Sequence, residues 1–397
     1  MNNFFSRWQI ADSWWRVALG IPLPRTGSLP RGKSDVDNIG VCVRSRGRGL
    51  LFFLLFLSLS SFSQTVKLLG QQQLNKWNIT PGNYSGISHV KDNVYAIVDD
   101  KDKVDGFKLL TLDIDLDNGK IRNASIAEPE GMKERRAKGE ATNRDCEGVA
   151  YFPEANTVFV SGEEEQRILE YSLDGRLTGR ELAIPSIMQR KQIVSNRGFE
   201  ALAYNGVQKR FWTTTESTLP ADGKLASAKN PDVYNRLRFV AFDTSLKPVE
   251  SFVYSMDLPK ATDKEANTIL GVPSLIALDD GRLIVMEREG CFPKKQYGSW
   301  VRIKLYIVNP KDSKSVSLSA PMSGVGEDAF MKKTLLCEFI TRLRLGKMNL
   351  SNYEGMCLGP KLHDGRQTLI LIADSQNGMG NWMYHIKDHI RVVIVDI

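Results

Sequence analysis

Motifs for the common hydrolytic nucleophiles are missing after residue 63 of this 397-residue chain. That part has no GxSxG elbow, no HExxH pair, no CxxxxxR loop and no Arg-His pair of the acid-phosphatase kind. These absences argue against serine-hydrolase, zinc-peptidase and covalent phosphatase chemistry. If the protein is an enzyme, a metal-activated water is the route that remains.

Cysteine and histidine are also scarce. Four cysteines follow residue 63 (Cys146, Cys291, Cys337 and Cys357), and none has CxxC spacing, which argues against a zinc knuckle. An exported protein could pair them in disulfides, but the sequence does not say which pairs form. His385 and His389 are four residues apart. They lie in a Gly-rich loop, so an ordinary loop role is favoured over a metal pair on a helix.

The net charge of +7 does not indicate a nucleic-acid partner. Residues 1–63 carry eight Lys/Arg and three Asp/Glu, which places +5 there and leaves +2 for the remainder. A nucleic-acid-binding domain concentrates positive charge on its folded surface. We therefore expect no nucleic acid among the partners, and we expect a monomer.

The longest apolar run covers only residues 50–60, which is too short to span a bilayer comfortably. Arg44, Arg46 and Arg48 precede it, and Ser61-Phe62-Ser63 follows. A basic region, an apolar core and small residues are typical of a signal peptide, predicted at residues 44–63. A short membrane anchor is the alternative. Residues 1–43 remain unassigned, and a start codon placed too far upstream would explain them. The mature chain would be secreted or periplasmic and would have no stable membrane span.

One short phrase recurs five times and sets the architecture. Each copy is a turn followed by a short apolar strand, with Ser, Glu, Glu, Ser and Glu at the third position: Ser85, Glu147, Glu200, Ser274 and Glu354. Each is followed by a second apolar strand that ends in acid, and a third that opens near a base, at Lys108, Arg167, Arg238, Arg302 and Arg391. Repeats of four antiparallel strands predict an all-β propeller.

We expect five blades, and a sixth if residues 311–349 hide one. The last repeat lacks a fourth strand, because the chain ends at Ile397. The segment at residues 65–70 could supply that strand and close the ring, which would remove an exposed sheet edge. Short turns would join strands one to two and three to four. The longer loops would then share one face with the acidic strand ends, and function usually lies on such loops.

Glu147, Glu200 and Glu354 occupy one repeat position on strands expected to line the central channel. Like charges that converge this way cannot all stay ionised unaided. A bound cation would compensate them, and oxygen ligands favour calcium over other metals, with magnesium less expected. The alternative is that each glutamate caps backbone N–H groups or pairs with an arginine of the next blade.

A second acidic column lies at the ends of the second strands: Asp99, Glu163, Glu216, Glu287 and Asp374. Cross-strand ion pairs with the bases that open the third strands are the favoured interpretation, each contributing ~0.2–1 kcal/mol. The functional alternative is an acid–base rim around a charged substrate. In that case Arg167, Arg238 and Arg302 would hold its anionic groups, because guanidinium binds phosphate in a bidentate manner.

The chain resembles the phytase-like family, named for the esterase-like activity of phytase. The resemblance rests on the openings Glu147-Gly148, Glu200-Ala201 and Glu354-Gly355, on a Lys-Thr-Leu-Leu strand at residues 333–336 before residues 352–356, and on Ala373-Asp374-Ser375. It covers roughly residues 80–396 within a domain at 64–397. It implies a secreted or periplasmic β-propeller that hydrolyses phosphoesters or esters. A serine at two of the five openings departs from the glutamate pattern.

The sequence therefore predicts a secreted, phytase-like hydrolase. In this interpretation Glu147, Glu200 and Glu354 hold calcium, and Arg167, Arg238 and Arg302 bind an anionic small molecule. A non-catalytic propeller that binds a glycan, a phosphate or a protein is the rival. Glutamates saturated by arginines would favour that rival, and glutamates converging on one point would favour the enzyme.

Overall fold

The computed structural model describes residues 66–397, with gaps at 143, 376–377, 379 and 382–383. The predicted signal peptide at 44–63 and the unassigned residues 1–43 lie outside the described residues. Among the helices that are described, none has the length and apolar character needed to cross a membrane.

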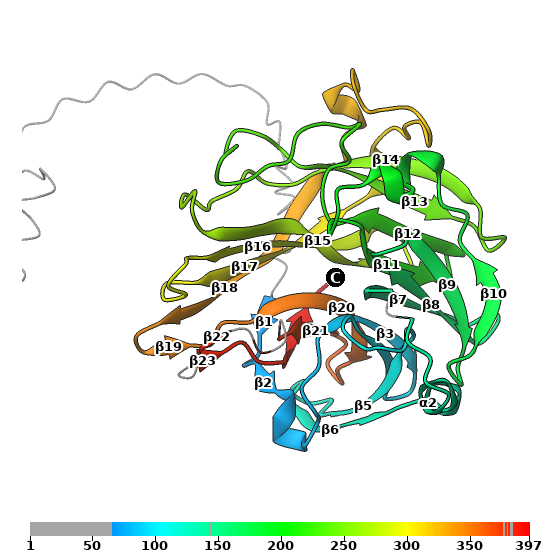
Figure 1. The fold of residues 1–397 in the computed structure, drawn as a ribbon, viewed down its shortest axis with the longest axis vertical. Helices are drawn as coiled ribbons and strands as arrows, with labels where there is room; N and C mark the ends of the chain where they lie inside the picture. The colour runs from blue at the N-terminus through cyan, green and yellow to red at the C-terminus, as the bar shows by residue number, and fades with distance from the viewer. Residues whose placement is uncertain (1–65, 143, 376–377, 379, 382–383) are drawn as a thin grey trace, which may run out of the picture. The chain divides into compact units, whose positions relative to one another are not determined.

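Five antiparallel sheets form a ring around a central axis, and each supplies one blade of a β-propeller (Figure 1). Blade one contains β3 (Tyr84–Lys91), β4 (Val94–Asp99), β5 (Lys108–Ile114) and β6 (Ile121–Ala127); blade two contains β7 (Cys146–Phe152), β8 (Thr157–Gly162), β9 (Arg167–Ser172) and β10 (Leu177–Glu181). Blade three contains β11 (Phe199–Asn205), β12 (Arg210–Thr215), β13 (Arg236–Phe242) and β14 (Pro248–Ser255). The single α-helix among the described residues, α2 (Glu130–Ala137), lies between blades one and two in the chain.

Blade four has longer strands than the other four blades. It contains β15 (Asn267–Ala277), β16 (Leu283–Phe292), β17 (Trp300–Val308) and β18 (Lys333–Arg344), and β18 continues into the short partner β19 (Lys347–Met348). Residues 311–349 do not form a sixth blade, because they supply a long loop and then the fourth strand of blade four. The propeller therefore has five blades.

The first described strand closes the ring. Blade five contains β20 (Asn352–Lys361), β21 (Gln367–Asp374) and β24 (His389–Val395), and β1 (Val66–Leu68) adds the fourth strand. Val66 pairs with Val395 and Leu68 with Val393, so the first and last described strands lie in one sheet. The short strand β2 (Gln72–Gln73) also pairs with β24. Closure by an N-terminal strand is thus confirmed, and it covers the edge that β24 would otherwise expose.

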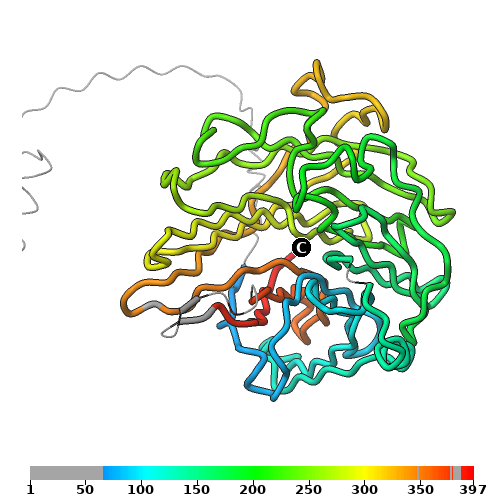
Figure 2. Tube along the Cα trace, viewed as in Figure 1, coloured from blue at the N-terminus to red at the C-terminus, as the bar shows by residue number. Residues whose placement is uncertain are grey.

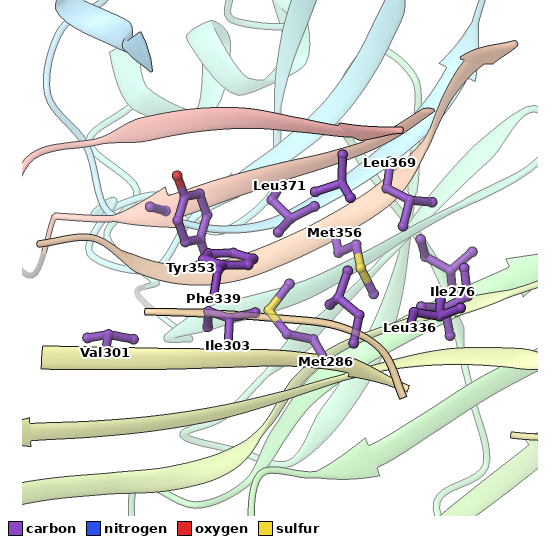
Figure 3. Packing of buried hydrophobic residues seen from close by; sticks show 14 of the residues in the cluster. Ile276, Met286, Val301, Ile303, Leu336, Phe339, Tyr353, Met356, Leu369 and Leu371 are labelled. Carbon is purple, nitrogen blue, oxygen red and sulfur yellow. The ribbon is translucent and has the colours of Figure 1, made fainter. Parts of the chain in front are cut away.

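Five large hydrophobic clusters form the core between neighbouring blades, and a small sixth cluster contains Ala228, Ala261 and Cys291. Figure 3 shows the cluster between blades four and five, where Met286 and Ile303 face Tyr353, Met356 and Leu371. Alternation along each strand sends apolar residues to the faces that neighbouring blades share. No single blade can bury both of its faces alone, so the ring must close for the core to form.

Glycines in the recurring phrase bring the inner strands together. These inner strands, the first of each blade, are β3, β7, β11, β15 and β20. A Cβ at Gly148 would lie 2.3 Å from the backbone oxygen of Glu200 on the next inner strand, and one at Gly86 would lie 2.2 Å from that of Glu147. The glycine that follows the glutamate therefore permits close backbone approach.

Candidate functional site

A cavity of about 350 Å³ opens where the inner strands begin, and we call it the channel mouth. Figure 1 shows the inner strands around the centre of the ring. Eight lining residues are acidic and three are basic: Asp100, Asp145, Glu147, Glu163, Glu200, Glu216, Glu354 and Asp374 against Lys101, Arg197 and Arg288. Such an excess of buried carboxylates is unfavourable unless protons or cations compensate it.

The three predicted glutamates reach the mouth through a repeated backbone irregularity. The ladder between the first two strands is bulged at Glu147, Glu200 and Glu354, and also at Ser85 in blade one. A bulge leaves a residue out of the ladder and redirects its side chain. All three glutamates line the mouth and are at least nine-tenths buried.

Blade four departs from the pattern that the sequence suggested. Its bulge lies between Gly271 and Ser274, so Val272 occupies the place of the glutamates and packs in the core. Ser274 lies beyond the bulge, where its hydroxyl accepts a hydrogen bond of 3.0 Å from the backbone N–H of Met356. The repeat alignment of this blade is therefore shifted by two residues, because bulge positions cannot be read from apolar spacing.

Arg288 is the central cation of the mouth. It pairs with Gly271 across the ladder, in the position that Gly162, Thr215 and Ala373 hold in other blades. Its guanidinium contacts Glu354, lies 2.7 Å from Glu216 Oε1 and lies 3.5 Å from Glu200 Oε2. Two of the three predicted glutamates therefore already have a cation, supplied by the neighbouring blade.

Glu147 lacks such a partner. Its side chain is 9% exposed and lines the mouth, and among the described residues no hydrogen bond or ion pair reaches its carboxylate. Oxygens of Asp100, Asp145 and Glu147 lie within 4.8 Å of one another, a spacing that fits a shared cation. Lys101 bridges two of them, with Nζ 2.8 Å from Asp100 and 2.7 Å from Asp145. An oxygen-only donor set of three carboxylates suits calcium or magnesium.

The pKa values reflect this crowding. Burial, followed by repulsion from Glu200 and Asp100, raises the pKa of Glu147 well above its ordinary value. Burial also raises the pKa of Asp100 and Glu163, each to about 7. Burial opposes the charge on Arg288, but the surrounding carboxylates outweigh it and raise the pKa of the guanidinium. The acids need a cation to stay ionised, whereas the arginine stays charged.

The acidic column at the strand ends divides between the mouth and the framework. Glu163, Glu216 and Asp374 line the mouth. In blade one the matching residue is Asp100 rather than Asp99, and in blade four it is Glu289 rather than Glu287. Glu287 instead accepts hydrogen bonds of 2.6 Å from Tyr254 and Lys333 outside the mouth. Bulges again displaced the register that the sequence suggested.

Among the described residues, ion pairs across strands two and three form in blade one, as predicted, and in blade four, where Arg302 lies 4.0 Å from Glu289 in place of the predicted Glu287. Asp99 contacts Lys108 at 2.8 Å. In the other blades the bases open the third strand but take different partners. Arg391, for example, stacks over Phe339 with its guanidinium carbon 4.6 Å from the ring centroid.

The three arginines predicted to bind substrate lie outside the mouth. Arg167 pairs with Glu181 at 2.7 Å, and Arg302 contacts Glu338 on the outer strand of blade four. Arg238 is 1% exposed and bound to Asp222, and it also donates to the backbone oxygens of Ser317 and Ala320. These contacts of Arg238 tie two long loops together.

Sequence reasoning missed Asp100, Lys101, Asp145, Arg197 and Arg288. Asp145 is the first residue of the recurring phrase, and its positive φ of 56° marks the turn that aims it at the mouth. Asp100 directly follows Asp99, so the sequence alone does not show which of the two acids lines the mouth. Arg288 lies between Glu287 and Glu289 in a long strand, and period-2 alternation alone places it on the face opposite to both.

The remaining cysteine and histidine candidates stay apart from the mouth. All four described cysteines are free thiols. His389 lies in β24, where burial lowers its pKa to about 4, and the side chain of His385 lies outside the described residues.

Comparison with known proteins identifies the family. No curated protein matches the chain. Solved structures with a similar fold include a streptogramin B lyase at 11% identity and TM-score 0.31, covering 84% of this chain and 98% of that one. Another is a tail fibre of Staphylococcus aureus phage P68, at 10% identity and TM-score 0.37, covering 82% of this chain and 52% of that one. These likenesses carry no argument about activity. The model of the phytase-like family, described as "esterase-like activity of phytase", matches residues 79–376, and the chain belongs to this family.

Proposed function

We propose that this protein is an exported, metal-assisted hydrolase of phosphoesters or esters that works at the channel mouth. One observation carries the proposal: Glu147 is buried beside Asp100 and Asp145, and no described residue pairs with its carboxylate. A nearly buried carboxylate without a partner is costly, and a divalent cation compensates it. The family, whose description names an esterase-like activity, supports the choice of reaction class.

The cation site that fits best differs from the one expected from sequence. Asp100, Asp145 and Glu147 would hold calcium, with magnesium as the second choice. Glu200 and Glu354 would contribute through Arg288, which holds them and Glu216 in fixed positions. When bound, a divalent cation polarises a phosphoryl or acyl oxygen and lowers the pKa of a coordinated water.

The chain's own residues have separate roles. Arg288 opposes the effect of burial, which raises the pKa of Glu200 and Glu354, and its contacts hold the wall opposite Glu147 in place. Arg197 contacts Glu216 and keeps a quarter of its side chain exposed at the mouth. Arg197 and the more exposed Lys101 are therefore the two cations in the mouth that can contact an anionic group entering from solvent. Free substrate anions would otherwise be repelled by the acidic lining.

Calcium binding and turnover test the proposal in wild type and in Glu147→Gln. At calcium a hundredfold above Kd, wild type should gain ~2.7 kcal/mol of stability, seen as a rise of several degrees in Tm. Glu147→Gln should lose most of that rise and at least tenfold in hydrolysis of a chromogenic phosphoester or ester. Exposed Glu265→Gln is the matched control and should behave like wild type. A wild-type Tm that changes with neither calcium nor chelator would refute the proposed cation site.

A binding propeller without catalysis is the second candidate. The saturation of Glu200 and Glu354 by Arg288 favours it, because those two glutamates then act as structural partners. Calcium-dependent stabilisation without turnover of any ester or phosphoester would support this alternative.

A further inference from the structure

Blade four extends beyond the other blades on the same face as the channel mouth. Its second and third strands, β16 and β17, have 10 and 9 residues, whereas their counterparts elsewhere have 6 to 8. The extra residues add roughly 7–13 Å of strand. Figure 1 shows β16, β17 and β18 running out from the ring, with β19 at the end, and Figure 2 shows the same extension as a tube.

The end of this extension, which we call the blade-four tip, exposes large apolar side chains. Tyr297 is 64% exposed, Leu345 90% and Met348 61%. Two turns meet there, because the backbone N–H of Leu345 donates a hydrogen bond of 3.3 Å to the hydroxyl of Tyr297. Single exposed apolar residues are ordinary, but three at one protruding tip mark an interaction site.

Positive charge surrounds these apolar residues. Residues 293–298 and 342–348 together contain five Lys/Arg and no Asp/Glu. Lys294 pairs with exposed Glu265 at 3.1 Å. Among the described residues, no ion pair reaches Lys295, Arg342 or Arg344, so these cations are available to an external anion. The rest of the chain after residue 63 is nearly neutral, which makes the concentration of charge at the tip specific.

We propose that the blade-four tip docks the propeller on the surface of a membrane that contains anionic lipids. Three apolar side chains are too few for a stable protein–protein interface, which buries 1,200 Å² or more in total. They suffice to enter the boundary between headgroups and acyl chains, while lysine and arginine side chains reach the headgroups. Cations flanking an apolar tip complement a negatively charged bilayer. The mouth, on the same face, would then open toward that surface.

Vesicle co-sedimentation tests the proposal, with the chain from Gln64 as the protein. Residues 66–397 form a closed ring with every blade complete, and the apolar run at 50–60 would bind vesicles by itself. The protein should sediment with phosphatidylcholine vesicles that contain about 30% phosphatidylglycerol, should bind far less to pure phosphatidylcholine, and should dissociate as salt rises.

Two tip variants and one control separate the contributions. Leu345→Ser with Met348→Ser should lower the partition coefficient about tenfold or more. Lys295→Gln with Arg344→Gln should lower it roughly 20- to 30-fold, about fivefold for each cation removed. Val207→Ser with Lys247→Gln changes exposed residues in the short turns at the opposite end of blade three and should leave binding unchanged. Circular dichroism and Tm establish that each variant is folded.

Three outcomes would overturn the proposal. One is wild-type binding that is absent or equal on neutral and anionic vesicles. Another is a control variant that loses as much binding as the tip variants. The third is self-association in solution that the Leu345→Ser, Met348→Ser variant abolishes while vesicles bind neither protein, because the tip would then join two copies of the chain. None of these outcomes depends on whether the channel mouth binds calcium.

Discussion

At the scale of single residues, the glutamates of the channel mouth differ in whether Arg288 contacts their carboxylate. Glu147, Glu200 and Glu354 share one repeat position and one kind of bulge, yet Arg288 neutralises only the last two. The shared repeat position places the three glutamates at one mouth. Their surroundings differ, because Arg288 of blade four contacts only two of them. Glu147, which Arg288 does not contact, lies beside two further acids, Asp100 and Asp145.

Lys101 provides a test at this scale. Its ammonium bridges Asp100 and Asp145, so a divalent cation in the site must break that bridge. Lys101→Met should therefore tighten calcium binding about fivefold, as expected when an ion pair worth ~1 kcal/mol no longer competes. Isothermal titration of calcium into both proteins measures the change. Lys133→Met, which removes an exposed pair on α2, is the control and should leave affinity unchanged. Weaker binding in Lys101→Met would contradict a competing role for the lysine.

At the scale of elements, the strand β24 carries a buried histidine inside the closing blade. His389 is 5% exposed, and among the described residues its Nδ1 has no hydrogen-bond partner. Burial lowers its pKa to about 4 from an ordinary value of 6.5. The unfolded chain therefore takes up a proton near pH 6.5 that the folded chain refuses until about pH 4. Stability from this residue is complete above pH 6.5 and is lost as pH falls toward 4.

The corresponding prediction compares wild type with His389→Gln. The difference in unfolding free energy between the two proteins should shift against wild type by at most about 3 kcal/mol as pH falls from 6.5 to 4. Urea denaturation at several pH values measures it, and acids that titrate in the same range affect both proteins alike. Asn123→Gln changes an exposed residue that does not titrate, and it should give a flat difference. A flat difference for His389→Gln as well would mean that the folded protein protonates His389 freely.

At the scale of the whole molecule, one short strand holds the ring closed. Val66 to Leu68 pair with Val395 to Val393, and this pairing joins the start of the propeller to its end. The five clusters of the core each need two adjacent blades, so loss of closure weakens the packing on both sides of blade five. It also leaves an unpaired edge on β24, which invites association with other chains.

Deletion of residues 64–70 tests this closure. The shortened protein should melt several degrees below the chain that begins at Gln64, and it should aggregate on heating because β24 becomes an edge strand. Differential scanning calorimetry and light scattering measure the two effects. The chain from Gln64 is the control for removal of the residues before it. Equal melting temperatures would show that the pairing of β1 with β24 contributes little to the stability of the propeller.

The sequence by itself determined the repeat, the order of strands, the closing segment and the convergence of three glutamates on one mouth. These follow from local rules, because alternation and turn residues act over a few positions. The tertiary structure decided which acids have partners. Arg288 reaches Glu216, 72 residues away, and Glu354, 66 residues away, and these contacts exist only once three blades pack together. In blades one and four, bulges shift the strand register relative to the one that the sequence predicts. The spacing of apolar residues does not reveal where a bulge lies. For that reason the sequence located the mouth, but only the packed ring distinguished Glu147 from its equivalents.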